Sequence, residues 1–451
     1  MKLLWYILLI TVANVCTAQI ITTVAGGVIG HGGYWGDGGP ATAAQITEIG
    51  SIAVDKKGNL YIADANNVRI RKVDAVTGII TTVAGTGIAG YNGDGIQATN
   101  AKLNLPSAVS VDTADNLYIS DENNYRIRKV EVSTGIITTF AGNGISGFSG
   151  DGGPATTAKI SQGFTAWDAK GNMYLNDGVN NRIRKIDLSG KINTIAGTGI
   201  RGCAVNGVVA TSASFSSGFI ASDALGNIYF TTGDSCAMVC KINSNTGIIT
   251  RVAGTDDRVG MPYSGDGLNA TSCHIYPFGI AVNNIGELYI ADYENQRIEK
   301  VDASGFIYSI AGSGINGFSG DGGLATGAKL SYPQTVALDA CNNVYIADFN
   351  NYRIRKVTFN PFPCPYLDIN MQNSQPLISI HPNPANDLIN VNNLKSPKTY
   401  QIVSVVGKSM QQGNLNPGDN IISLKSLPSG MYLLELTDEE GNRTVHKIIK
   451  Q

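Results

Sequence analysis

The stretch Ile21-Thr-Thr-Val-Ala-Gly26 decides the fold, because it returns five more times along the chain with small changes. Its last residue recurs about every 57 residues, at Gly26, Gly85, Gly142, Gly197, Gly254 and Gly312. Self-similarity at a fixed period is typical of repeat architectures in which each repeat is one supersecondary unit. The sequence therefore predicts six related units.

Each repeat contains four short runs typical of β-strands. In the first complete repeat they are Ser51–Asp55, Leu60–Asp64, Arg69–Val73 and the next copy of the Ile-Thr-Thr-Val motif. Turns rich in Gly, Asn and Asp separate them, which favours antiparallel pairing. Four such strands form one propeller blade, so the repeats predict an all-β, six-bladed β-propeller.

The phase of the repeats predicts how the ring closes. The chain opens with a fourth strand alone, Ile20–Ala25, and its last repeat has only the first three strands, Gln334–Val357. Six complete blades result if the N-terminal strand pairs with the last three, and this closure leaves no free sheet edge. The predicted propeller spans residues 19–358.

An aspartate and an arginine recur five residues apart across the second hairpin of five blades, which predicts a hydrogen-bonded ion pair in each. In the fourth blade Thr232 and Ala237 replace both members. The turn between them carries an asparagine, a residue that tolerates left-handed backbone geometry. The pairs are Asp64/Arg69, Asp121/Arg126, Asp177/Arg182, Asp292/Arg297 and Asp348/Arg353, and the asparagines are Asn67, Asn124, Asn180, Asn295 and Asn351.

The Gly-rich loops between blades supply the candidate binding residues. Each loop carries an aromatic residue and an aspartate, which are Tyr34, Asp37, Tyr91, Asp94, Phe148, Asp151, Tyr263, Asp266, Phe318 and Asp321. Carboxylates in such loops could bind calcium, and aromatic rings could stack on sugars or peptide side chains. The alternative is structural, with the aspartate bonded within its turn and the ring packed on the loop. No cofactor is expected, and calcium is the one ion that these loops suggest.

No catalytic constellation stands out in the sequence. The innermost strands carry no charge before a terminal acid, which is Asp55, Asp112, Asp168, Asp223 or Asp339, with Asn283 in the fifth blade. These residues precede tight turns, where aspartate commonly caps the turn. The two histidines of the predicted propeller, His31 and His274, fall in loops between blades.

Six cysteines follow the predicted signal peptide, and an even number outside the cytoplasm favours disulfides. Cys341 and Cys364 are expected to pair, because the first turn of a blade and the end of its third strand lie on one face. Cys203 and Cys236 form the second expected pair, which leaves Cys240 and Cys273 open.

The repeats resemble NHL repeats, particularly the bacterial and teneurin-like variety that contains Gly147-Phe-Ser-Gly-Asp-Gly-Gly-Pro-Ala-Thr156. Related six-bladed propellers include lactonases and amidating lyases that hold a divalent metal near the central axis. The resemblance therefore implies an alternative function for this chain, that of a metal-dependent, lactonase-like hydrolase or lyase.

Both ends of the chain indicate export. Residues 1–18 have a basic start, the apolar run Leu3–Ala13 and small residues at 16–18, as in a cleaved signal peptide. This apolar run is too short to span a bilayer, and no other stretch predicts a transmembrane segment. Residues 359–376 read as a linker, and residues 377–451 hold about seven short strands, which predict a small Ig-like β-sandwich.

The tail resembles the sorting domain of the type IX secretion system. Pro382-Asn-Pro-Ala385, Gly407-Lys408 and Leu427-x-x-Gly430-x-Tyr432 carry the resemblance. It implies a Gram-negative bacterium, the type IX machinery as a partner, and a location outside the cell or on the outer-membrane surface. The alternative is an accessory Ig-like domain that simply stays attached.

Charge and composition exclude one further class of partner. The formal net charge is −2, so no basic field attracts nucleic acid. The sequence therefore favours a non-catalytic, secreted binding scaffold for an extracellular protein or glycan.

Overall fold

The computed structural model describes residues 19–27, 33–161, 163–203, 206–233, 236–255, 263–359, 379–381, 385–394, 396–404, 409–438 and 443–450. It divides into two compact units, Met1–Phe362 and Pro363–Gln451. The predicted signal peptide and nearly all of the predicted linker lie outside the described residues. No helix in the described part of the chain has the length and apolar character needed to cross a membrane.

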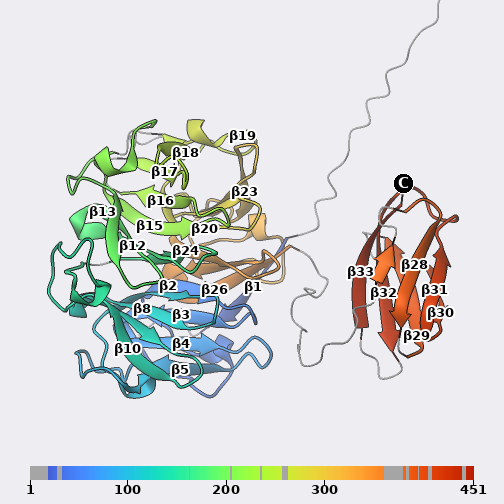
Figure 1. The fold of residues 1–451 in the computed structure, drawn as a ribbon, viewed down its shortest axis with the longest axis horizontal. Helices are drawn as coiled ribbons and strands as arrows, with labels where there is room; N and C mark the ends of the chain where they lie inside the picture. The colour runs from blue at the N-terminus through green and yellow to red at the C-terminus, as the bar shows by residue number, and fades with distance from the viewer. Residues whose placement is uncertain are drawn as a thin grey trace, which may run out of the picture. The chain divides into compact units, whose positions relative to one another are not determined.

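The first unit is a β-propeller of six antiparallel sheets, as predicted (Figure 1). The strands are, for blade 1, β2 (Ile49–Val54), β3 (Leu60–Asp64), β4 (Arg69–Val73) and β5 (Ile80–Ala84); for blade 2, β7 (Pro106–Val111), β8 (Leu117–Asp121), β9 (Arg126–Val130) and β10 (Ile136–Ala141); for blade 3, β11 (Thr165–Trp167), β12 (Met173–Asp177), β13 (Arg182–Ile186) and β14 (Ile192–Ala196); for blade 4, β15 (Ser217–Ser222), β16 (Ile228–Thr232), β17 (Ala237–Ile242) and β18 (Ile249–Thr255); for blade 5, β20 (Pro277–Val282), β21 (Leu288–Asp292), β22 (Arg297–Val301) and β23 (Phe306–Ala311); and for blade 6, β24 (Pro333–Leu338), β25 (Val344–Asp348), β26 (Arg353–Thr358) and β1 (Ile20–Ala25).

The N-terminal strand closes the ring, as the phase of the repeats predicted. Strand β1 pairs antiparallel with β26, from Ile20 opposite Thr358 to Ala25 opposite Ile354. Ile21 and Ala25 are fully buried in this pairing. Closure therefore buries apolar side chains and also pairs the backbone hydrogen-bonding groups at the free edge of blade 6.

The core lies between neighbouring blades. The second strand of every blade is buried along its whole length. Tyr61 and Ala63 of blade 1, for example, belong to one apolar cluster with Val109 and Ile119 of blade 2. Because both faces of a blade are covered, its strands are rich in apolar residues at consecutive positions.

Each Gly-rich loop covers the outer edge of the blade that follows it. In blades 2 and 5 the loop adds a short fifth strand, β6 (Ile96–Gln97) or β19 (Leu268–Asn269), and in the other four it forms a single bridge. A 3-10 turn then leads inward to the first strand. These turns are η1 (Ala41–Ala43), η3 (Ala98–Asn100), η5 (Ala155–Thr157), η7 (Ala210–Ser212), η8 (Ala270–Ser272) and η9 (Ala325–Gly327).

The turn between the second and third strands corrects the prediction for its asparagine. In four blades it is a 3-10 turn, η2 (Ala65–Asn67), η4 (Glu122–Asn124), η6 (Gly178–Asn180) or η10 (Phe349–Asn351). The left-handed residue is the one after the asparagine, such as Val68 with φ 53°. The Asn67 amide instead donates to Asp64 and to the Gly33 carbonyl of the loop, so its side chain, rather than its backbone, serves the turn.

The second unit is a small sandwich of a three-stranded and a four-stranded sheet, in agreement with the sequence prediction. Its core includes Ile389, Ile402, Leu434 and Ile448, which are fully buried. The strands are β27 (Ser379–His381), β28 (Leu388–Leu394), β29 (Lys398–Ser404), β30 (Ser409–Leu415), β31 (Gly418–Ser423), β32 (Gly430–Asp438) and β33 (Arg443–Lys450).

Candidate binding site

A buried arginine joins three strands to the Gly-rich loop in four of the six blades. In blade 1, Arg71 is fully buried, with Nη1 3.3 Å from Asp64 Oδ2 and Nη2 2.6 Å from Asp37 Oδ1. Asp37 also accepts from the backbone and hydroxyl of Thr82 on β5, at 2.9 and 2.6 Å. The same arrangement recurs around Arg128, Arg184 and Arg355.

This network corrects the predicted ion pairs. Asp64 lies opposite Arg69 in the strand register, yet its ionic partner is Arg71, seven residues away and diagonal across the hairpin. Arg69 instead donates to the carbonyls of Asn67 and Thr86. Diagonal neighbours on one face of an antiparallel pair are within reach of a long side chain, so spacing along the chain did not identify the partner.

Burial and charge act in opposite directions on the two carboxylates. Burial raises the pKa of Asp64, although Asn67, Thr47 and Arg71 favour its charged form. Burial also acts to raise the pKa of Asp37, but hydrogen bonds from Thr82 and Tyr34 and the charge of Arg71 lower it overall. The loop carboxylate is therefore the better solvated of the two anions that face each arginine.

The structure places the predicted loop residues on this network. The Tyr34 ring lies 3.7 Å from the guanidinium carbon of Arg69 and 4.7 Å from that of Arg71, and its hydroxyl bonds Asp37. Tyr91, Phe148 and Phe318 stack on the matching arginines of their blades, and Tyr263 stacks on Arg297. Asp94, Asp151 and Asp321 each pair with a buried arginine. The loop residues are thus partly exposed, but their polar atoms are bonded within the blade.

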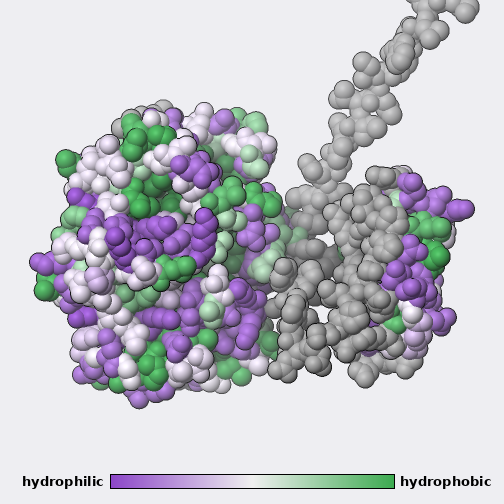
Figure 2. Space-filling model, viewed as in Figure 1, coloured by the Kyte–Doolittle hydropathy of each residue, from purple (hydrophilic) through white to green (hydrophobic). Residues whose placement is uncertain are grey.

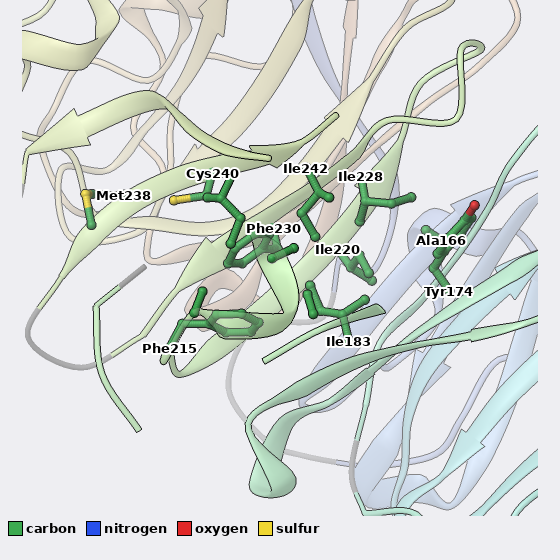
Figure 3. Packing of buried hydrophobic residues seen from close by; sticks show 14 of the residues in the cluster. Ala166, Tyr174, Ile183, Phe215, Ile220, Ile228, Phe230, Met238, Cys240 and Ile242 are labelled. Atoms are coloured by element: carbon green, nitrogen blue, oxygen red, sulfur yellow. The ribbon is translucent and has the colours of Figure 1, made fainter. Parts of the chain in front are cut away.

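Blade 4 has lost every member of the network. The register places Met238 and Cys240 where blade 1 has Arg69 and Arg71, so the position assigned to Ala237 from the sequence was one residue too early. Cys240 packs in an apolar cluster with Phe215 and Phe230 (Figure 3). A disulfide joins Cys203 of the loop to Cys236, with the two Cα atoms 5.8 Å apart.

The remaining cysteines are only partly described. Cys240 and Cys273 are buried, free thiols. Cys341 is disulfide-bonded, whereas Cys364, its expected partner, lies outside the described residues.

Blade 5 keeps the acids but not the buried arginine. Glu299 stands at the position of Arg71 and is fully buried. Its Oε2 accepts from Tyr263 at 3.0 Å and its Oε1 from Ser309 at 3.0 Å. Asp266 accepts from the Ser309 backbone at 2.5 Å, and Asp292 completes a group of three acids.

A run of five aromatic rings crosses blades 3 to 6 where the first strands begin. Centroid distances are 3.7 Å for Phe164–Phe219, 5.1 Å for Phe219–Phe278, 5.0 Å for Phe278–Tyr293 and 4.9 Å for Tyr293–Tyr332. Phe278 is 37% exposed. We call these five residues the aromatic mouth.

Two rings of the aromatic mouth, Phe164 and Phe219, line a central cavity. The cavity has a volume of about 290 Å³ and is lined by residues of all six first strands, including Phe164, Phe219 and Trp167. At the equivalent first-strand positions blades 1 and 2 have Gly50, Ser51, Ser107 and Ala108, so the rings lie on one side of the propeller. Sequence reasoning missed this site, although aromatic residues at the start of consecutive first strands were the available signal.

The acids at the other end of the first strands cap turns, as predicted. Asp55 accepts from the backbone of Lys57 and Asn59, from the Asn59 amide and from the Tyr61 hydroxyl. In blade 5 the acid and the amide are exchanged, and Asn283 bonds Glu287 at 2.8 Å. Within the described residues, no group of three His, Cys, Asp or Glu side chains could hold a metal ion.

Comparison with known families agrees with both units. Residues 379–451 match the family described as the secretion system C-terminal sorting domain, and residues 28–90 match the teneurin NHL domain. The chain joins a propeller whose repeats match the NHL family to a type IX sorting domain. The sorting domain assigns it to the secreted or cell-surface proteins of Gram-negative bacteria and makes the type IX machinery its partner in export.

Named relatives share the propeller over part of their length. The chain is 27% identical over 410 residues to Protein SUPPRESSOR OF QUENCHING 1, chloroplastic, of Arabidopsis thaliana, covering 85% of this chain and 36% of that protein. It is 27% identical over 337 residues to human teneurin-1, covering 67% of this chain and 10% of teneurin-1. The NHL-repeat protein thus spans about a third and a tenth of these relatives.

Two solved bacterial structures have the same fold. A protein of unknown function from Bacteroides thetaiotaomicron has a TM-score of 0.55 at 19% identity, covering 75% of this chain and 76% of that chain. An auxiliary nutrient binding protein from Bacteroides ovatus has a TM-score of 0.52 at 16% identity, covering 76% and 77%.

Proposed function

We propose that this secreted NHL-repeat protein is a non-catalytic binding protein whose extracellular ligand, a protein or a glycan, docks on the aromatic mouth. The observation that carries the proposal is the continuous run of five rings, two of which line the central cavity. Binding sites are typically concave and lined by aromatic groups with a few polar atoms, and aromatic rings dominate the energetics of many interfaces.

The polar surroundings of the mouth support the same role. Gln334, next to the inner-strand residue Thr335, has an Oε1 atom with no hydrogen-bond partner. The Tyr293 and Tyr332 rings bring hydroxyl groups to the same run of rings. The face of the propeller in Figure 2 shows hydrophilic and hydrophobic residues interspersed. One of the structural neighbours is described as an auxiliary nutrient binding protein, which is a binding role for that protein on this fold.

The test compares variants on an array of immobilised neutral oligosaccharides and peptides. Phe278→Ala and Tyr293→Ala remove rings from the mouth, whereas Tyr308→Ala removes a 43% exposed ring from the outer strand of the same blade. We expect every probe bound by the wild type to be lost or weakened at least tenfold by the two mouth variants and kept by the control. Binding that survives both mouth variants, or the absence of any bound probe, would contradict the proposal.

A further inference from the structure

We propose that blade 5 makes the aromatic mouth proton-dependent, because a buried pair of acids stands beneath it where four other blades hold an acid and an arginine. The inference concerns regulation of the site assigned under the proposed function and rests on that function. Its structural part can be tested without a ligand.

The acid pair is connected to the mouth through the backbone. Asp292 Oδ1 accepts from the Tyr276 backbone at 2.7 Å, two residues before Phe278. Tyr293 follows Asp292 directly and stacks on Phe278. Asn295 donates to both Asp292 oxygens, at 3.0 and 2.9 Å, and so fixes the turn that carries Tyr293. A change in the charge of Asp292 therefore alters the backbone contacts that position two of the five rings, Phe278 and Tyr293.

Glu299 meets acidic or neutral groups from nearly every element packed against it. Asp292 faces it from β21, Tyr263 and Asp266 from the Gly-rich loop, and Ser309 from β23. Cys273, at the end of η8, is also close enough to feel the Glu299 charge. The following residue, His274, contacts Thr255.

Among the described residues, the charge of Arg297 acts on Asp292, but the hydrogen bonds of Arg297 go to other groups. Arg297 on β22 donates to the Ser309 hydroxyl and to the carbonyls of Gly312 and Ser313. In blade 1 a guanidinium lies between the two acids instead, 2.6 Å from one and 3.3 Å from the other. In the part of the chain that the structure describes, blade 5 thus has three acids around a position that carries a positive charge in four other blades, and a proton can neutralise this excess of negative charge.

The titration follows from this geometry. Burial, and then the charge of Asp292, raise the pKa of Glu299 to about 8. Burial raises the pKa of Asp292 to about 7. A raised pKa in the folded state means that the stabilisation is complete below the ordinary carboxyl pKa and is lost as the pH rises through the folded value. The ordered mouth is accordingly most stable at acidic pH, loses stability progressively as the pH rises towards about 8, and changes little above that value.

Hydrogen exchange measured by mass spectrometry tests this proton dependence in the full chain. After correction for intrinsic exchange, we expect segment 276–296 to lose protection about tenfold between pH 7 and pH 9, from a single group with a pKa near 8. The matched segment 104–125 of blade 2, which has Arg128 at the position of Glu299, should lose far less. This comparison needs no variant.

Variants then assign the effect to the pair. Glu299→Gln keeps the shape of the side chain without its titration and should abolish the tenfold loss, and Asp292→Asn is the second variant if the first fails to fold. Glu131→Gln, at an exposed turn of blade 2, is the matched control. Equal protection of the two segments at pH 9, or an unchanged loss in both acid variants, would overturn the proposal.

Ligand binding separates the two proposals. A probe that depends on Phe278 should bind the wild type more weakly at pH 9 than at pH 7, and Glu299→Gln should bind it equally at both. Probe binding independent of Phe278, with the exchange result intact, would contradict the proposed function but not the proton-dependent structure. Phe278-dependent binding that is unchanged by pH would overturn the regulatory proposal alone.

Discussion

Replacing Arg128 by methionine tests whether the buried diagonal pair, rather than the directly opposite pair, stabilises a blade. Arg128 and Asp121 are both fully buried and lie 3.4 Å apart. Removing one partner of such a pair costs about 3–5 kcal/mol, because an uncompensated charge remains. Asp121 keeps hydrogen bonds from Asn104 at 2.7 Å and Asn124 at 2.8 Å, so we expect the lower end of this range.

Asp94, the second acid that pairs with Arg128, adds little to the free-energy cost of removing the arginine. The Asp94 side chain is 40% exposed and can be solvated by water when the arginine is gone. A loss of about 3 kcal/mol corresponds to a fall in Tm of roughly 6 °C for a domain of this size. Arg126→Met is the matched control, because Arg126 donates to the carbonyls of Asn124 and Asn143 and its loss leaves no buried acid behind.

A double-mutant cycle completes the test. Blade 4 shows a neutral alternative, with Thr232 at the position of Asp121 and Cys240 at that of Arg128. Combining Asp121→Thr with Arg128→Met removes both buried charges, so the double variant should be no less stable than Arg128→Met alone. We expect a coupling of about 1–3 kcal/mol in denaturant unfolding. Additive effects, or an equal cost for Arg126→Met, would refute the assignment of the pair.

Four further outcomes follow from the structure. Deleting Ile20–Ala25 removes β1 and the buried Ile21, so we expect aggregation or a large fall in Tm, and an unchanged Tm would contradict ring closure. Reducing the Cys203–Cys236 disulfide, which closes a loop of 33 residues, should cost about 3–4 kcal/mol, whereas equal melting with and without reductant would argue against this role. Deleting residues 377–451 should leave the protein in the periplasm, as shown by cell fractionation, and normal secretion would count against sorting by the tail. We also propose that the loop aspartates hold no calcium tightly, because arginine already neutralises four of them; calcium retained after dialysis, measured by elemental mass spectrometry, would reverse this view.

The sequence predicted the ring because the repeats report the strand order directly. Six copies of one motif, with the fourth strand placed first, allow a single closure, and the pairing of β1 with β26 confirms it. The turn-capping role of acids such as Asp55 was equally readable, because its acceptors and donors lie within six residues of one another. Local contacts of this kind are encoded by spacing along the chain.

Contacts between elements were harder to predict. The partner of Asp64 is a diagonal residue, and the choice between Arg69 and Arg71 depends on the direction of each side chain rather than on register. The aromatic mouth joins rings from four blades, and the three phenylalanines are more than fifty residues apart, so each one seen alone is an ordinary apolar residue near the start of a strand. The ion pair required the directions of the side chains within one hairpin, and the aromatic mouth required the assembled ring.

The two blades that depart from the common network also supply three of the five rings of the mouth. Blade 4 contributes Phe219 and replaces its charges by apolar residues and a disulfide. Blade 5 contributes Phe278 and Tyr293 and replaces its arginine by Glu299. Blades 1 and 2 retain the full network and contribute no ring, whereas blades 3 and 6 retain it and contribute one ring each. Because a charged network stabilises four blades without any ligand, its loss in the two blades that supply most of the rings supports the proposal that this side of the propeller binds a ligand, with a disulfide in one blade and a titratable pair in the other.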